Sequence, residues 1–181
     1  MRRNTRALAF GGIVSALCWT LLISTGLFPF MSYTMPAIAG FVLIAVAFEN
    51  GTEWAYLTYI AVSFLCFIMA TDIEAVILFF AVFGYYPTLR LKLQMMKPRW
   101  SVFLIKTVIF NLAIFIDYIL ISHVLGLPYL TEEFVALTPL LIAGLLFIIN
   151  VVFWIYDMAV GNMTRFYIVV IRPKLKSGQH I

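Results

Sequence analysis

Charged residues are scarce in this chain. Only 11% of its 181 residues are Asp, Glu, Lys or Arg, whereas 64% are hydrophobic and the mean hydropathy is +1.05. A water-soluble domain of this length cannot hide so much apolar surface in a single core. The composition therefore excludes an ordinary soluble enzyme or binding domain and indicates that lipid surrounds most of the chain.

Cysteine and histidine are also rare. The two cysteines, Cys18 and Cys66, lie inside apolar runs, and the two histidines are His123 and His180. These positions give no disulfide or zinc-site spacing. The chain also shows no phosphate-binding loop and no serine–histidine–acid motif. We therefore expect no catalytic residue, no metal and no cofactor, and we expect that the protein is not an enzyme.

Apolar runs of near-membrane length occupy most of the sequence. A helix needs about 20 apolar residues to cross a bilayer. The second run is short, so the second and third runs are either two full spans or a re-entrant pair. We predict an all-α integral membrane protein with six transmembrane helices in a single domain over 1–181, ending in a basic cytoplasmic or interfacial tail over 158–181. The predicted helices cover about 7–28, 33–48, 54–70, 73–88, 102–124 and 134–157.

Basic residues are missing from the turns on one side of this predicted bundle. If the N-terminus is cytoplasmic, the inner segments are the N-terminus, 49–53, 89–101 and the tail after 158. Eleven of the 12 Lys and Arg residues lie in these segments, and the other one, Lys106, lies five residues after the segment 89–101. Cytoplasmic loops of membrane proteins are enriched in Lys and Arg. The pattern predicts a multi-pass plasma-membrane protein with both termini in the cytoplasm. It also explains the net charge of +4, because basic residues on the inner side face the membrane lipid. We therefore expect no nucleic acid as a partner.

Small residues recur every four positions in the first apolar run. Gly11 and Ser15 fall on one face of a helix, beside Gly12 and Ala16 on a neighbouring face. Helix backbones approach closely along such faces in a membrane. The pattern indicates either packing within the bundle or docking of another membrane subunit on these four residues.

The fifth run carries the deepest polar residues. Asp117 lies about 10 Å from the outer end of a helix over 102–124, and Asn111 and Tyr118 lie in the same run. A carboxylate at that depth is costly unless it pairs with another group or faces a wet cavity. Asp117 is therefore a candidate binding residue, and structural pairing is the alternative.

Two acidic residues, Asp72 and Glu74, also stand at the start of the fourth apolar run. Thr71-Asp72-Ile73-Glu74 has the spacing of a capping box, in which the acid satisfies backbone N–H groups at the start of a helix. Capping explains these acids without a ligand.

Two short segments carry a resemblance to a known family. Gly12-Ile13-Val14-Ser15-Ala16 is similar to an Ala-x-x-x-Ala pattern, and Pro36-Ala37-Ile38-Ala39-Gly40 resembles an outer-side entry to a second helix. With its length and topology, the chain resembles the substrate-binding S components of energy-coupling factor (ECF) transporters for vitamins and other micronutrients.

The resemblance implies a protein that binds and carries a small, vitamin-like molecule. Its first helix would dock on a transmembrane coupling subunit, and separate cytoplasmic ATPases would supply the energy. The ligand would lie in the outer half of the bundle, and an acid there favours a ligand with a cationic or hydrogen-bond-donating group. The alternative is a non-transporting membrane protein that assembles with or regulates another complex. By the resemblance, the expected substrate-binding residues are Asp117 and Asn111, with Tyr33, Thr34, Asp72 and Tyr118 as gate or rim groups.

Overall fold

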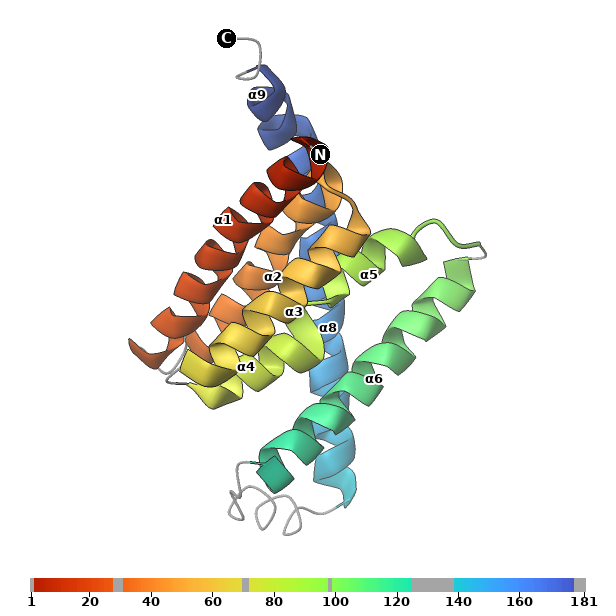
Figure 1. Ribbon diagram of the computed structural model, residues 1–181. Coiled ribbons are helices and arrows are strands. Elements are labelled where there is room, and N and C mark those ends of the chain that lie inside the picture. The colour runs from red at the N-terminus through yellow and green to blue at the C-terminus, as the bar shows by residue number, and fades with distance from the viewer. Residues whose placement is uncertain (1, 28–30, 70–71, 98, 125–138, 178–181) are drawn as a thin grey trace. The chain divides into compact units, whose positions relative to one another are not determined.

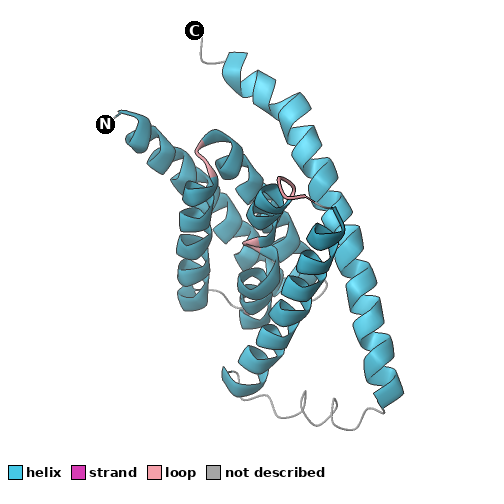
Figure 2. Ribbon diagram, turned by 90° about the vertical axis from the view of Figure 1, so that its right-hand side faces the viewer, coloured by secondary structure: helices cyan, strands magenta, loops and turns pink. Residues whose placement is uncertain are grey.

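The protein is described by a computed structural model that covers residues 2–27, 31–69, 72–97, 99–124 and 139–177. Helices make up almost all of this part of the chain, and it contains no strand (Figure 2). Six helical segments within it are long and apolar enough to cross a membrane. The prediction of an all-α protein with six helices of membrane-spanning length is confirmed.

The helices keep the order expected from the apolar runs. Their bounds are α1 (Arg2–Ser24), the short 3₁₀ helix η1 (Thr25–Leu27), α2 (Met31–Glu49), α3 (Thr52–Met69), α4 (Ile73–Leu78), the π-helical turn η2 (Phe79–Phe83), α5 (Tyr86–Leu93), α6 (Arg99–Val124), α8 (Pro139–Phe166), a second π-helical turn η3 (Tyr167–Ile171) and α9 (Arg172–Ser177). The second and third helices are 19 and 18 residues long. At 1.5 Å per residue each is about 27 Å or more in length, close to the thickness of the hydrocarbon layer, so each is long enough to cross singly.

The last helix continues beyond its predicted end. The apolar pattern ends the sixth span at 157, whereas α8 extends to Phe166 and passes through η3 into α9. Polar residues such as Asn162 and Arg165 interrupt the apolar run there, but no proline occurs between Pro139 and Pro173 to stop the helix. The polar residues mark the end of a hydrophobic stretch and not the end of the helix, so the segment after 157 is helical as far as Ser177.

The chain forms two compact units, residues 1–137 and 138–181. In the first unit α1, α2 and α3 pack on one another (Figure 1), and α2 also contacts the broken fourth span. Between α2 and α3 the chain turns at Gly51, whose φ of 100° lies in the left-handed region that favours glycine. The core of this unit consists of buried residues that include Cys18, Leu22, Ala39, Leu43, Val46, Ala55, Tyr59, Val62 and Phe79.

The fourth span is broken near its middle. Between α4 and α5 the N–H of Gly84 donates to the carbonyl of Phe79, five residues back, at 2.7 Å. Pro87, at the start of α5, has no N–H to continue an α-helical ladder. The span is therefore two α-helical pieces joined by a π-helical turn.

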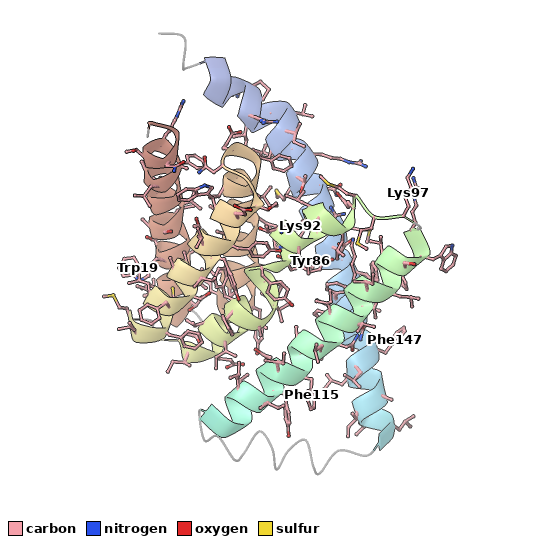
Figure 3. The ribbon with its side chains drawn as sticks, turned by 45° about the vertical axis from the view of Figure 1, so that its right-hand side comes forward. Trp19, Tyr86, Lys92, Lys97, Phe115 and Phe147 are labelled. Atoms are coloured by element: carbon pink, nitrogen blue, oxygen red, sulfur yellow. The ribbon has the colours of Figure 1, made fainter. Side chains whose placement is uncertain are left out.

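The first unit has an acidic end and a basic end. At the acidic end, the starts of α2 and α4 meet through a hydrogen bond from Ser32 to Asp72. At the basic end, the amide of Asn50 donates to the carbonyl of Ala7 at 3.2 Å, and the Lys92 ammonium lies 5.0 Å from the ring centre of Tyr56. In Figure 3, Lys97 lies near the start of α6, and Phe115 lies toward the other end of that helix. Within this unit, these two contacts place the start of α1, where Arg6 lies, at the same end as Lys92.

Candidate binding site at the acidic end

Asp72 joins two helices and caps one of them. Its backbone is extended, and its Oδ1 accepts a hydrogen bond of 3.1 Å from the N–H of Ala75, which satisfies one of the free donors at the start of α4. Its Oδ2 accepts a bond of 2.6 Å from the hydroxyl of Ser32 on α2. Asp72 is thus the N-cap residue, and it fixes the start of α4 against the start of α2.

Glu74 lies two residues after Asp72, in the first turn of α4, and binds a different partner. Its Oε1 accepts a hydrogen bond of 3.3 Å from the hydroxyl of Tyr33, which is 60% exposed on α2. Glu74 is itself exposed. Asp72 and Glu74 therefore present two carboxylates on adjoining parts of one helix start.

Asp117 approaches the same place from α6, which packs against α4 and η2. Glu74 and Tyr33 both interact electrostatically with Asp117. The Oδ1 atom of Asp117 is buried and has no hydrogen-bond partner in the part of the chain that the structure describes. Three carboxylates, borne on α4 and α6, thus gather near the phenol of Tyr33.

The charge of this acidic cluster, Asp72, Glu74 and Asp117, is not balanced within the described ranges. None of the three carboxylates forms an ion pair there, and the hydrogen bonds that they accept come from a backbone N–H, a serine and a tyrosine. The described acids, histidines and cysteines also form no group of three that could hold a metal ion. The arrangement is suited to an organic group that carries a positive charge or several N–H donors, because such a group interacts with dispersed carboxylates without needing tight coordination.

The structure brings together three of the six predicted binding residues. Tyr33, Asp72 and Asp117 lie together in the acidic cluster or beside it. Asn111 is six residues before Asp117 on α6, about 9 Å away along the helix axis, and its amide donates to the carbonyl of Thr107 in its own helix. Thr34 and Tyr118 are exposed side chains.

Ser32 and Glu74 belong to the site but were not predicted from the sequence as binding residues. Glu74 was attributed to a capping box with Thr71, which lies outside the described residues; within them Asp72 caps α4, and Glu74 accepts a hydrogen bond from Tyr33. An acid in the first turn of a helix is favourable without any ligand, so the sequence offered no reason to assign Glu74 to a binding site. Ser32 gave no signal beyond its place next to Tyr33.

The small residues of α1 separate into an inner and an outer set. Gly11 is buried, and a Cβ at this position would lie 3.2 Å from the hydroxyl of Thr58 on α3, so Gly11 serves packing within the unit. Gly12 is exposed, and a Cβ there would have no neighbour within 4 Å. Ala16 is exposed as well, and Ser15 is half-buried between the two faces. Gly12 and Ala16 thus form an exposed strip without bulky side chains, whereas Gly11 packs against α3.

Comparisons of the chain with protein families, with characterised proteins and with solved structures find no match.

Proposed function

We propose that the chain is the membrane-embedded substrate-binding subunit of an importer of the energy-coupling factor type. It binds a small, vitamin-like molecule with a cationic or hydrogen-bond-donating group at the acidic end. The observation that carries this proposal is the convergence of Asp72, Glu74 and Asp117, without a compensating cation in the described ranges, around the hydroxyl of Tyr33.

Asp117 is the residue on which the proposed binding depends most. Its buried oxygen has no protein donor in the described part of the chain, and a carboxylate within an apolar helix is costly unless something satisfies it. A ligand that donates an N–H group to this oxygen would remove that cost, and a charged donor forms the stronger bond. Binding energy is therefore concentrated on Asp117, while Glu74 and Tyr33 contact the ligand from the side of α4 and α2.

The same proposal orients the protein. The basic end, with Lys92 and Lys97, faces the cytoplasm, and the acidic end faces outward, which follows the enrichment of Lys and Arg in cytoplasmic loops. Both termini are then cytoplasmic in a multi-pass protein of the plasma membrane. The acidic cluster receives its ligand from outside the cell.

The first helix provides the contact for a coupling subunit. Gly12 and Ala16 lie on an exposed strip without bulky side chains, where another helix can approach closely. Cytoplasmic ATPases attached to that coupling subunit supply the energy. The chain itself needs no catalytic residue and no cofactor for this task.

Co-purification with mass spectrometry tests the proposal. The protein is extracted in mild detergent, and the small molecules released on denaturation are compared with those from Asp117→Asn and from a control, Glu53→Gln, which changes an exposed acid at the start of α3. The proposal requires one compound that is enriched with the wild type and with Glu53→Gln and is absent with Asp117→Asn. No enriched compound with any of the three proteins, in cells supplied with a complete medium, would refute it.

A second function is favoured by one specific observation, the open space at Gly12. A non-transporting membrane protein that assembles with or regulates another complex would use this strip in the same way, with no ligand at the acidic cluster. The partner that co-purifies separates the two functions: a coupling subunit with ATPases supports the importer, and a different stable membrane partner supports the assembly role.

A further inference from the structure

Tyr59 donates a hydrogen bond to the broken part of the fourth span. Its hydroxyl lies 2.6 Å from the carbonyl oxygen of Phe80, which belongs to the π-helical turn η2. The two residues come from different helices, α3 and the fourth span, and Tyr59 is buried. A backbone carbonyl of the irregular turn thus accepts a side-chain donor from another helix.

The ring of Tyr59 is fixed from several sides. It stacks on Phe80 with an angle of 13° between the rings, and it also contacts the rings of Phe79 and Tyr85. Next to it, Gly84 has no side chain, and a Cβ there would lie 2.5 Å from the tyrosine ring. The ring therefore fills the space that the glycine leaves, directly beside the N–H that makes the π-type bond to Phe79.

A π-helical turn inside a membrane span needs such support. It contains one more residue than an α-helical turn and leaves backbone groups with poorer partners. In a membrane, backbone groups without a partner are costly, and neighbouring helices commonly supply the missing bonds. Tyr59 supplies one of these bonds, and Pro87 on the other side of the turn cannot donate one.

We infer that η2 is a conformational switch in the fourth span and that Tyr59 holds it in the π-helical form. When the tyrosine bond is released, the turn adopts regular α-helical pairing. The change of one residue in the pairing rotates α4 relative to α5 by roughly 100° and shifts it by about 1.5 Å.

The rotation moves the start of α4. Asp72 and Glu74 lie on this segment, so the switch separates them from Ser32 and Tyr33 on α2 and opens the acidic cluster. This conformational change is independent of what the cluster binds, and its test needs no ligand.

Distances between two spin labels test the inference. The buried cysteines Cys18 and Cys66 are replaced with alanine, and nitroxide labels are attached at Leu17→Cys on α1 and Ile73→Cys on α4, where the side chains are 50% and 41% exposed. Pulsed electron resonance then measures the distribution of distances in detergent. A rotation of α4 displaces the Cα of residue 73 by about 3.5 Å, which a flexible label amplifies.

Two variants should produce the same second state by different routes. Tyr59→Phe removes the hydroxyl that donates to Phe80, and Pro87→Ala restores a backbone N–H at the start of α5. We expect a single maximum in the parent protein and an additional maximum at one common distance in both variants. Tyr56→Phe, which removes a hydroxyl from the same helix but keeps the ring under Lys92, should match the parent.

Every other pattern overturns the inference. An unchanged distribution in Tyr59→Phe shows that the hydroxyl does not hold the turn. An unchanged distribution in Pro87→Ala, or different second distances in the two variants, shows that there is no shared second state. A second maximum in Tyr56→Phe shows that the effect is not specific to Tyr59. Helical content and a monodisperse elution profile are measured for each variant, and a second maximum that accompanies lost helix is unfolding and also contradicts the switch.

Discussion

The hydroxyl of Tyr33 donates a hydrogen bond of 3.3 Å to Oε1 of Glu74, across 41 residues of sequence. With the bond from Ser32 to Asp72, it makes the start of α2 and the start of α4 one polar surface. Asp117 on α6 adds a third carboxylate to that surface. These contacts give the acidic end both its structure and its proposed role, so the first question for experiment is whether the two can be separated.

Substitutions at Asp72 separate helix capping from charge. Asp72→Ala removes the acceptor for the Ala75 N–H and for Ser32, and we expect it to lower the free energy of unfolding by about 1–2 kcal/mol. Asp72→Asn removes the charge but keeps an oxygen that can cap the helix, so its loss of unfolding free energy should be much smaller, at most a few tenths of the loss in Asp72→Ala. Reversible unfolding in mixed micelles measures the difference. Equal losses for the two variants would mean that the charge, and not the cap, fixes this helix start.

Gly84 is required because Tyr59 occupies the space where a side chain would be. The Cβ of Gly84→Ala would lie 2.5 Å from the tyrosine ring and 2.9 Å from the Phe79 carbonyl, so we expect a loss of about 1–3 kcal/mol in unfolding free energy. Gly12→Ala is the matched control, since its Cβ meets no atom within 4 Å and alanine is the better helix former. Thermal melts of both variants in one detergent test this, and a Gly84→Ala variant as stable as Gly12→Ala would contradict the packing at the π-helical turn.

Much of the fold could be predicted from the sequence because hydropathy is a local property. Apolar runs of near-membrane length indicated six helices, and the structure differs by a few residues at most helix ends. The last helix was predicted too short, because polar residues after Asp157 end the apolar run but not the backbone ladder. The π-helical turn at Phe79–Phe83 was not predicted, since it depends on a tyrosine from α3 and a glycine beside it.

The acidic site was predicted only in part. An intramembrane acid is unusual on its own, so Asp117 was recognisable without a structure. Glu74 was assigned to helix capping, because its partner Tyr33 is distant in sequence and a local pattern explained it. Likewise, the sequence showed two neighbouring small-residue faces on α1, and only the position of Thr58 shows that Gly11 is inside and Gly12 outside.

The proposed orientation can be measured with single cysteines. Met95→Cys at the basic end and Leu27→Cys at the end of η1 place thiols at positions that are 86% and 73% exposed. A membrane-impermeant maleimide added to intact cells should label Leu27→Cys and leave Met95→Cys unlabelled until the cells are opened, because the basic end faces the cytoplasm. The reverse labelling would show that the acidic end is inside and would remove the basis for an importer.

The outward strip of α1 predicts a specific loss of partner binding. Gly12→Leu places a large side chain where another helix would approach, and we expect recovery of the coupling subunit in pull-downs to fall at least about tenfold, a loss of roughly 1.4 kcal/mol or more. Ala61→Leu adds a large side chain on an exposed position of α3 and should leave recovery unchanged. Equal recovery with both variants would contradict docking on this strip.

The binding of a ligand by Asp117 can be measured through the affinity of the compound identified by co-purification. Titration calorimetry with that compound compares the wild type with Asp117→Asn, which keeps the shape of the side chain but removes its charge. We expect the affinity to fall by at least about a hundredfold, since a charged hydrogen bond contributes roughly 1.5–3 kcal/mol and the Coulombic attraction adds to it. We also expect the variant to be as stable as the wild type or more stable, because a buried oxygen without a protein partner in the described ranges is no longer charged. An unchanged affinity in a folded Asp117→Asn protein would show that Asp117 does not bind the ligand.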